Sequence, residues 1–384
     1  MQVGTKKAIR TIVFGIGVLG VIASAGVLLS GQSNSASSRL PRKSNPAGWR
    51  TGQIVIKPQF EWASNFKDGL AAVRIGGKAG YIDKTGHFVI NPRFDVAYNF
   101  ADGLAAVRIR AYGADKWGYI DKTGHFVINP QFDDANEFAD GLAAVLIGDY
   151  KTGRWGFIDK TGHFVINPQL DYAEEFHYGL ALVKIAGEEA IIDKSGSRVS
   201  EVDALTTMSK HGFDVAIPRF DEKTGKNGYA DVTGNYLINP QFDYAGDFHD
   251  ELACVGIGDN PNRKYGYIDK TGHFVIDPQF AEGADFADGL ARVLIGHFMT
   301  GKWGYIDKTG SFVINPQFDD VKNFADGLAG VRMGDFSTGK WGYIDKAGHF
   351  VIKPQFDDVE NFSEGLAKVR YGDYKTGKYG FIAR

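Results

Sequence analysis

The chain has 384 residues, of which 43% are hydrophobic and 13% aromatic, so it can bury a sizeable core and is not disordered in composition. The formal net charge is −3, but the first 47 residues hold basic residues and no acid, so the remainder is clearly acidic. That balance disfavours nucleic acid as a partner, because a nucleic-acid surface needs clustered positive charge. The single cysteine, Cys254, excludes an intramolecular disulfide and a cysteine-rich metal site.

The amino-terminal segment, residues 1–30, predicts a signal peptide or a transmembrane anchor. Residues 11–30 form an uncharged apolar run behind three basic residues. We favour the anchor, because a run of this length can span a bilayer core of roughly 30 Å. Small residues at 23–25 would also suit a signal peptidase, so cleavage stays an alternative.

Residues 31–47 are rich in Ser, Asn and Pro and predict a flexible linker. Residues 48–384 form the body. Basic residues ahead of an apolar helix tend to stay inside, so we expect a cell-envelope protein with an extracytoplasmic body, anchored to the membrane through its N-terminal helix. The alternative is a secreted or periplasmic protein after signal cleavage.

The body consists of tandem repeats of about 38 residues, a period typical of solenoids and propellers. An Asp-Lys turn recurs with six spacings of 38 residues and one of 34, at Asp83, Asp121, Asp159, Asp193, Asp231, Asp269, Asp307 and Asp345.

Each unit begins with a β-hairpin. In the clearest copy, Trp117–Asp121 and His125–Asn129 are short β-branched and aromatic runs joined by Asp-Lys-Thr-Gly. Asp121 can accept backbone hydrogen bonds across the turn, and Gly124 can adopt the positive φ that closes it. Pro130 is expected to end the second strand.

The remainder of the unit predicts one helical turn and a third strand. Asp133 or Asp134 can cap a turn within 132–138, and Leu142–Ile147 is a third strand whose character emerges when the copies are compared. One row of that strand is apolar in every copy, while the alternating row varies and includes Arg and Lys. We expect the varied row to be exposed.

The predicted fold is therefore all-β, with three antiparallel strands per unit. Residues 195–227 are the least regular copy. We favour a curved open solenoid over a closed, propeller-like ring. One observation favours the ring. The body begins, after Thr51-Gly52, with the second strand of a repeat unit and ends with the first strand of a unit at Lys378–Ile382. Pairing these two strands would leave no open edge.

The recurring Trp-Gly, followed by Tyr/Phe-Ile-Asp-Lys-Thr-Gly and Pro-Gln-Phe-Asp, resembles the WG (KWG) repeat family of bacterial proteins. The resemblance implies a β-rich repeat suspected of mediating binding, with no catalytic residues. The pattern lacks Trp at five copies, where we align Ala79, Ala190, Asn227, Tyr265 and Tyr379. A ligand contact needed in every copy would not survive such changes, so we expect a structural core role for Trp117, Trp155, Trp303 and Trp341.

We predict no catalytic, cofactor-binding or metal-binding residues. The recurrent His lacks a second ligand type, and the Asp pairs lack calcium-loop spacing. The leading hypothesis is a non-enzymatic scaffold for protein–protein interaction; the alternatives are a cell-wall glycan-binding array and a structural spacer. The candidate interaction surface comprises Arg74, Arg108, Tyr150, Lys184, Arg292, Arg332, Lys368, Arg370 and Tyr374.

Overall fold

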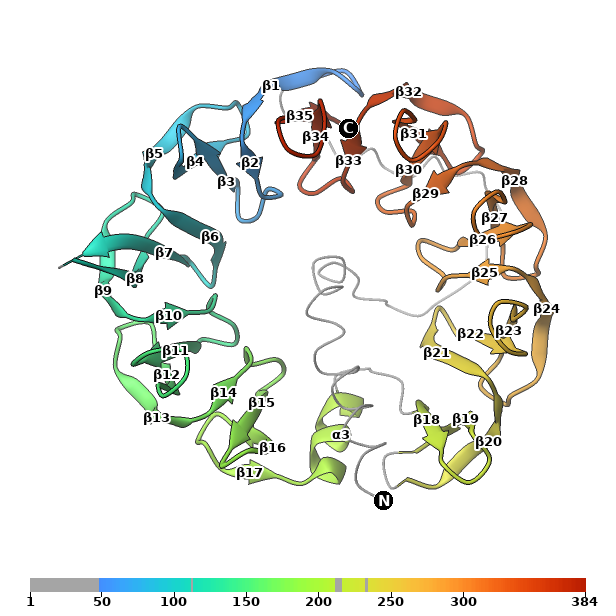
Figure 1. Ribbon diagram of the computed structural model, residues 1–384, viewed down its shortest axis with the longest axis horizontal. Helices are drawn as coiled ribbons and strands as arrows, with labels where there is room; N and C mark the ends of the chain where they lie inside the picture. Colours follow the sequence, from blue (N-terminus) through green and yellow to red (C-terminus); the bar gives the residue numbers. More distant parts are fainter. Residues whose placement is uncertain (1–47, 112, 211–215, 232–233) are drawn as a thin grey trace, which may run out of the picture.

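A computed structural model describes residues 48–111, 113–210, 216–231 and 234–384. In these residues the chain forms nine small antiparallel sheets arranged in a ring (Figure 1). The predicted all-β class is confirmed. The predicted N-terminal helix and linker lie outside the described residues, and within the described part no helix is long and apolar enough to span a membrane.

We number the sheets along the chain, and each is given from its inner to its outer strand. Sheet 1 comprises β2 (Trp62–Ala63), β3 (Leu70–Ile75), β4 (Lys78–Asp83) and β5 (Phe88–Phe94); sheet 2 comprises β6 (Val96–Ala101), β7 (Leu104–Ala111), β8 (Ala114–Ile120) and β9 (Phe126–Phe132). Sheet 3 comprises β10 (Asp134–Ala135), β11 (Ala143–Ile147), β12 (Arg154–Ile158) and β13 (Phe164–Leu170); sheet 4 comprises β14 (Tyr172–Ala173), β15 (Leu180–Ile185), β16 (Glu188–Asp193) and β17 (Arg198–Val199).

The second half of the ring follows the same order. Sheet 5 comprises β18 (Ile217–Asp221), β19 (Lys226–Ala230) and β20 (Tyr236–Phe242); sheet 6 comprises β21 (Tyr244–His249), β22 (Leu252–Ile257), β23 (Lys264–Ile268) and β24 (Phe274–Phe280). Sheet 7 comprises β25 (Glu282–Gly283), β26 (Ala291–Ile295), β27 (Lys302–Ile306) and β28 (Phe312–Phe318). Sheet 8 comprises β29 (Asp320–Val321), β30 (Leu328–Met333), β31 (Lys340–Asp345) and β32 (Phe350–Phe356); sheet 9 comprises β33 (Asp358–Val359), β34 (Leu366–Tyr371), β35 (Lys378–Ala383) and β1 (Ile54–Phe60).

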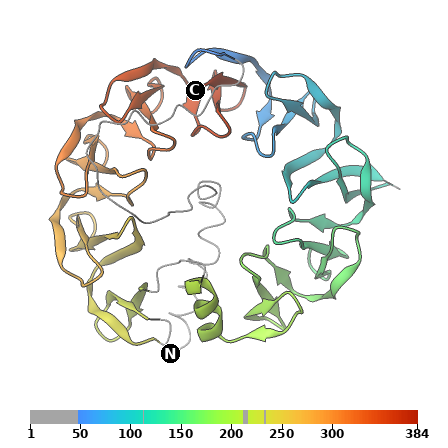
Figure 2. The ribbon, with the colours of Figure 1, turned by 180° about the vertical axis from the view of Figure 1, so that it is seen from behind.

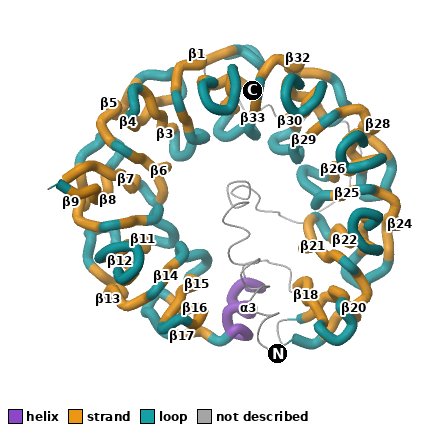
Figure 3. The backbone as a smooth tube through the Cα atoms, viewed as in Figure 1, coloured by secondary structure: helices purple, strands orange, loops and turns teal. Residues whose placement is uncertain are grey.

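The prediction of three strands per unit is wrong, because eight of the nine described sheets have four strands. The segment predicted to form a helical turn instead begins with the two-residue strand β10, in which Asp134 pairs with Leu146 and Ala135 with Val145. This strand directly follows the outer strand β9 of sheet 2, so the chain passes from the outer side of one sheet to the inner side of the next. Figure 3 shows the resulting inner strands and turns around the central opening.

The outer strand is bulged, and this explains the glycine of the Trp-Gly pair. Strand β9 pairs with β8 through Trp117 opposite Phe132, Tyr119 opposite Ile128 and Ile120 opposite Phe126. The register changes from each of these pairs to the next, so β9 has extra residues that bulge out. A Cβ on Gly118 would lie 2.6 Å from the Ile128 carbonyl oxygen and 2.7 Å from the Pro130 nitrogen, so only glycine fits. The expectation that Pro130 ends the strand is wrong, because β9 continues to Phe132.

The ring is closed by its two ends. Strand β1 pairs antiparallel with β35, with Ile54 opposite Ile382 and Phe60 opposite Tyr379. Figures 1 and 2 show β1 completing the sheet that contains the C-terminus. The favoured open solenoid is therefore wrong and the alternative ring is observed; closure protects the sheet edges that a solenoid would leave exposed.

Adjacent sheets pack face to face. Between sheets 2 and 3, one buried cluster joins Trp117 and Tyr119 to Val145 and Ile158. The Tyr119 hydroxyl donates to the Asn136 carbonyl of the next sheet at 2.9 Å, which satisfies the one polar group of this aromatic side chain. Each sheet is thus covered on both faces, and the core lies between sheets rather than within one of them.

The ring has two faces. On the turn face lie the turns between inner and second strands and the Asp-Lys-Thr-Gly turns; on the loop face lie the loops between second and third strands, such as Gly148–Gly153. Residue Gly52 donates its backbone N–H to the Ala383 carbonyl, at the end of β35 opposite the loop that precedes Lys378. The described chain therefore enters the ring at its turn face.

One helix, α3 (Glu201–Lys210), occurs in the described part and occupies the irregular copy. The Asp203 N–H donates to Ser200 Oγ at 3.1 Å, which caps the helix. Leu205 of α3 is buried with Leu182 of sheet 4 and Ile217 of sheet 5. The helix fills the inner position beside β18, where sheet 5 has no described inner strand (Figure 3).

Candidate interaction surfaces

The tryptophans of the Trp-Gly pairs are buried between adjacent sheets. Trp117, Trp155, Trp303 and Trp341 are 4–9% exposed and belong to the clusters between sheets. Their burial leaves them out of reach of a ligand at the surface.

The strand register corrects one position of the repeat alignment. Val107 pairs with Gly118 in sheet 2, and the equivalent Val183 pairs with Ala190 in sheet 4. Ala190 therefore replaces the glycine of the Trp-Gly pair, and Glu189 replaces the tryptophan.

The Asp-Lys-Thr-Gly turn has the predicted geometry. Asp121 Oδ1 accepts the backbone N–H of Thr123 at 2.9 Å and of His125 at 3.1 Å, and Gly124 has φ +89°. The hydrogen bond from the Thr123 hydroxyl is the main cause that lowers the pKa of Asp121. These carboxylates are occupied by their own turns, so they are poor candidates for external ligands.

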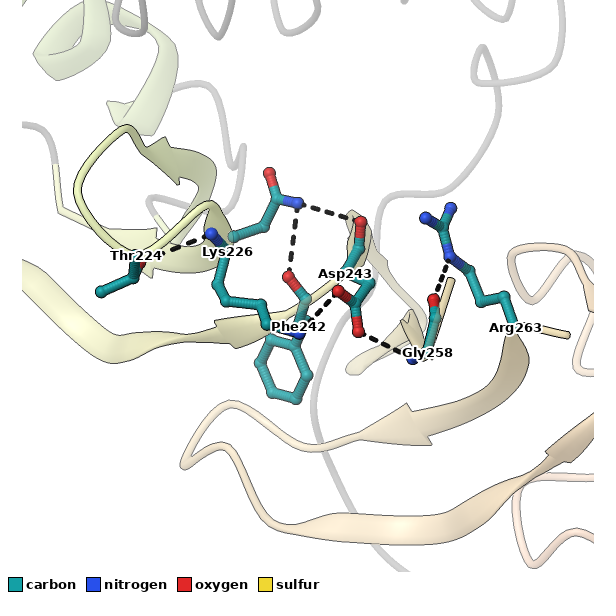
Figure 4. Close-up of polar contacts among 7 residues, drawn as sticks. Thr224, Lys226, Phe242, Asp243, Gly258 and Arg263 are labelled. Carbon is teal, nitrogen blue, oxygen red and sulfur yellow. Dashed lines mark hydrogen bonds and ion pairs between the residues drawn. The ribbon is translucent and has the colours of Figure 1, made fainter. Parts of the chain in front are cut away.

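The aspartate that directly follows an outer strand, Asp133 in the clearest copy and Asp243 in sheet 6, does not cap the expected helical turn but joins neighbouring sheets. In Figure 4, Lys226 of sheet 5 donates to Asp243 Oδ1 at 2.6 Å, and Oδ2 accepts the Gly258 N–H of sheet 6 at 2.7 Å. The Lys226 hydrogen bond is the main cause of the lowered pKa of Asp243. We call this arrangement the clasp; its ion pair recurs at 2.5 Å in Lys78–Asp95, Lys116–Asp133, Lys302–Asp319 and Lys340–Asp357.

The strand predicted as the third of each unit is the second strand of each sheet, counted from the inner side of the ring. Its varied row of side chains does not form an exposed face, contrary to expectation. Ala144 is fully buried and Leu182 is 7% exposed, because the next sheet covers this row. Arg292 donates through Nε to Asn323 Oδ1 of the next sheet at 2.9 Å, and Lys368 Nζ donates to the Ala63 carbonyl across the closure at 3.1 Å. Both candidate residues thus tie sheets together.

Four other candidates lie on consecutive sheets because the ring is closed. Arg332, Arg370, Arg74 and Arg108 occupy equivalent positions on sheets 8, 9, 1 and 2. Two of them are engaged locally: Arg332 has an 11% exposed side chain 3.4 Å from Asp320, and the Arg370 guanidinium donates to the Gly372 carbonyl at 2.6 Å. The side chains of Arg74 and Arg108 are 46% and 35% exposed.

The remaining candidates are accessible. Lys184 is exposed on β15, and Tyr150 and Tyr374 are 90% and 87% exposed at the tips of loops on the loop face. Sequence reasoning missed Phe336 and Phe298, which are 90% and 67% exposed at the same loop position. Phe298, Phe336 and Tyr374 follow one another at intervals of 38 residues, a signal that could have revealed them.

The inner side of the ring is acidic, which was also missed. The eight segments that enter the central opening hold 25 of the 46 acidic residues and two of the 43 basic residues, so negative charge is concentrated there; they are 61–69, 95–103, 133–141, 171–179, 243–251, 281–289, 319–327 and 357–365. Part of this charge is paired with lysines of the Asp-Lys turns, in Lys84–Glu364 at 2.9 Å, Lys122–Asp68 at 3.6 Å and Lys346–Asp288 at 3.3 Å.

The WG containing repeat matches the chain in eight tandem segments: 50–78, 80–111, 117–150, 155–188, 228–260, 265–296, 303–335 and 341–379. The chain belongs to this family. The unmatched residues 189–227 contain α3, so the family pattern and the geometry agree on where the repeat is interrupted.

No curated protein matches the sequence of this WG repeat protein. Among solved structures, it is similar to a eukaryotic initiation factor, with 12% identity, a TM-score of 0.39 and 87% of each chain covered. It is also similar to prolyl oligopeptidase B from Galerina marginata, with 12% identity and a TM-score of 0.36 over 88% of this chain and 56% of that one. The β-propeller domain of the trilobed protease from Pyrococcus furiosus gives 8% identity and a TM-score of 0.35 over 84% and 96%.

Proposed function

We propose that this protein is a non-enzymatic ring scaffold that binds a protein partner through its loop face. The observation that carries the proposal is the set of largely exposed aromatic side chains at the loop tips, Phe298, Phe336 and Tyr374, on the consecutive sheets 7, 8 and 9. Exposed aromatic side chains bury a large area on binding and lose little conformational entropy, so they are effective anchors at protein interfaces.

The loops that carry these aromatics are preorganised. Asp373 Oδ1 accepts the backbone N–H of Lys375 at 2.7 Å and of Thr376 at 2.9 Å. Asp335 does the same for Ser337 and Thr338, both at 2.8 Å. Loops held in this way pay a smaller ordering cost on binding than flexible loops.

The described chain enters the ring at the turn face, opposite the exposed aromatics. A membrane anchor in residues 1–30 would therefore be attached on the side of the ring that does not carry the loop tips. Export, anchoring and a place in the cell envelope belong to the proposal.

The absence of enzymatic activity is proposed because the repeated polar groups serve the fold. The Asp residues of the turns and clasps are hydrogen-bonded within the ring, and in the described ranges no group of three His, Cys, Asp or Glu side chains is placed to hold a metal ion. A catalytic site would need chemistry that differs from its surroundings.

A cell-wall glycan is the second candidate, because exposed Tyr and Phe can stack on sugar rings. It would depend on the loop-tip aromatics, since the repeat tryptophans are buried.

The test is affinity capture with the full chain, using envelope extract and, separately, purified wall polysaccharide. The variant Phe336→Ser/Tyr374→Ser should lose the captured protein, whereas Val127→Ser, which removes a 47% exposed apolar side chain from the outer strand β9, should retain it. Retention by polysaccharide alone would establish the glycan alternative. Equal protein capture by the two variants would reject the loop face.

A further inference from the structure

The junction between sheets 1 and 2 departs from the repeat at two positions, and both departures introduce arginine. Arg93 stands on β5 where the other outer strands that contain Pro have Gln59, Gln131, Gln169, Gln241, Gln279, Gln317 and Gln355. Arg110 stands where six other sheets have a glycine that starts the loop, namely Gly76, Gly148, Gly258, Gly296, Gly334 and Gly372.

The backbone explains how Arg110 is accommodated. Strand β7 continues through this residue, with Arg110 paired opposite Asp115, instead of turning as the glycine-containing copies do. Asp95 still forms its clasp with Lys78 at 2.5 Å, and the Arg110 N–H takes the role that the loop glycine has elsewhere. The clasp is therefore intact, and an extra guanidinium is added beside it.

These residues line an open cleft of about 400 Å³ between the two sheets. Its basic groups are Lys78, Arg93 and Arg110, opposed by the single acid Asp95. Because Asp95 is paired with Lys78, the two arginines give the lining residues an excess of positive charge. Asp115, which stands opposite Arg110 on β8, lies 3.9 Å from Arg108. A volume of this size suits a small ligand.

The walls of the cleft are aromatic. Phe94 and Phe126 meet edge to face with ring centroids 6.2 Å apart, and the Arg93 guanidinium lies 5.0 Å from the Phe94 centroid. One Arg93 nitrogen donates to the Gly124 carbonyl at 2.5 Å, which fixes the plane of the guanidinium. A planar, oriented guanidinium favours carboxylate and phosphate groups.

We propose that this cleft binds a small anion whose carboxylate or phosphate group is attached to an aromatic or other planar apolar body. Arg93 and Arg110 hold the anionic group, and the partly exposed side chains of Phe126 and Ile109 contact the apolar body; Phe94 is buried behind Phe126 and supports it. The cleft lies between sheets 1 and 2 and is lined from β4, β5, β7 and β9, whereas the loop-tip aromatics lie on sheets 3, 7, 8 and 9, so the two proposals stand separately.

The experiment measures binding of phenyl phosphate, benzoate, inorganic phosphate and benzylamine to the full chain by titration calorimetry. The variant Arg93→Gln restores the residue that seven other outer strands carry, so it should fold; Arg110→Gln keeps the strand backbone. Each should weaken phenyl phosphate or benzoate binding about tenfold, the effect of losing one charged hydrogen-bond donor. The control Lys151→Gln, on a loop of sheet 3, should leave binding unchanged.

The relative affinities of phenyl phosphate and benzoate identify which anionic group the cleft prefers. Absence of saturable binding of both anions would overturn the proposal, as would undiminished binding in Arg93→Gln and Arg110→Gln. Benzylamine binding as tightly as the anions would overturn the role of charge. Inorganic phosphate binding as tightly as phenyl phosphate would overturn the role of the aromatic walls.

Discussion

The junction between sheets 2 and 3 and the junction between sheets 4 and 5 show how one residue type decides the local architecture. In sheet 2, Gly118 admits the bulged outer strand β9, which runs for seven residues and leads directly into the inner strand of sheet 3. In sheet 4, Ala190 occupies the glycine position, and the outer strand β17 has only two residues, paired without a bulge.

After β17 the chain forms α3 instead of an inner strand. A Cβ at the glycine position collides with the backbone of a bulged strand, so the regular crossover cannot form there. The helix then supplies the apolar contacts that an inner strand would otherwise make. The difference teaches that the ring tolerates loss of a strand if the space between two sheets is filled.

The largest expected effect is that of Gly118→Ala. The new Cβ would lie within 3 Å of three backbone atoms of β9, so the outer strand must shift, and we expect a loss of about 3 kcal/mol in the free energy of unfolding. Urea unfolding measures the loss, and hydrogen exchange should localise it to residues 126–132. The matched control is Ala190→Gly, which should change stability by less than about 1 kcal/mol because no bulged strand lies opposite. Equal losses in both variants would contradict the comparison.

A smaller effect is expected from opening a clasp by Asp243→Ala. This removes the acceptor of both Lys226 Nζ and the Gly258 N–H from a side chain that is 12% exposed, and should cost about 2 kcal/mol. Asp259→Ala, on the neighbouring loop, should cost less than about 0.5 kcal/mol. Urea unfolding again gives the comparison, and similar costs would show that the clasp does not join the sheets.

The clasp also has a pH signature. The folded-state pKa of Asp243 is lowered, chiefly by the Lys226 hydrogen bond, so its contribution is present above the unfolded-state pKa of about 4 and is lost as the pH falls through the folded-state value. The stability of wild type and Asp243→Ala should therefore converge below pH 4.

The helix at the irregular junction should be sensitive to its cap. Ser200→Ala removes the acceptor of the Asp203 N–H and should cost about 1 kcal/mol, seen as faster hydrogen exchange in residues 201–210. Ser200→Asp should preserve the cap and the exchange rate. Faster exchange at residues 126–132 in Ser200→Ala would mean that the two junctions are not independent.

The sequence predicts the parts of this fold that depend on local interactions. The hairpin Trp117–Asp121/His125–Asn129 was predictable because the turn Asp and Gly and the alternating strands lie within a few residues of one another. The family itself follows from the same motif.

The parts that escaped prediction depend on neighbouring sheets. Strand β10 has two residues, too few to show a periodicity. Asp133 resembles a helix cap in sequence, because its partners Lys116 and Gly148 come close to it only in the folded ring. The varied row has polar members, yet the next sheet covers it. Closure depends on the angle between successive sheets, which no local pattern encodes.

The candidate interaction surface divides in the same way. Tyr150 and Tyr374 were identified because they vary among copies in a loop, and the structure places both at exposed tips. Arg292 and Lys368 vary too, but their partners lie on the adjacent sheet. Variation among repeats therefore marks both free loops and specific contacts between sheets, and only the three-dimensional structure separates them.

The last expected effect is confined to a change of pH and concerns Glu175, on the sheet that precedes the irregular junction. Burial, together with the nearby charge of Glu137, raises the pKa of Glu175 from 4.5 to about 7. The folded state thus favours the protonated form. The stability it provides is present below pH 4.5 and is lost as the pH rises towards 7.

Glu175→Gln replaces the carboxylate by a neutral group that can still accept the Glu137 backbone N–H. Above pH 7 the variant should be more stable than wild type, and below pH 4.5 the two should coincide. Glu188→Gln, at an exposed position of β16, removes the same charge from the same sheet and should show no such pH dependence. A stability difference for Glu175→Gln that is constant from pH 4 to pH 8 would show that packing, rather than the buried carboxylate, limits stability next to α3.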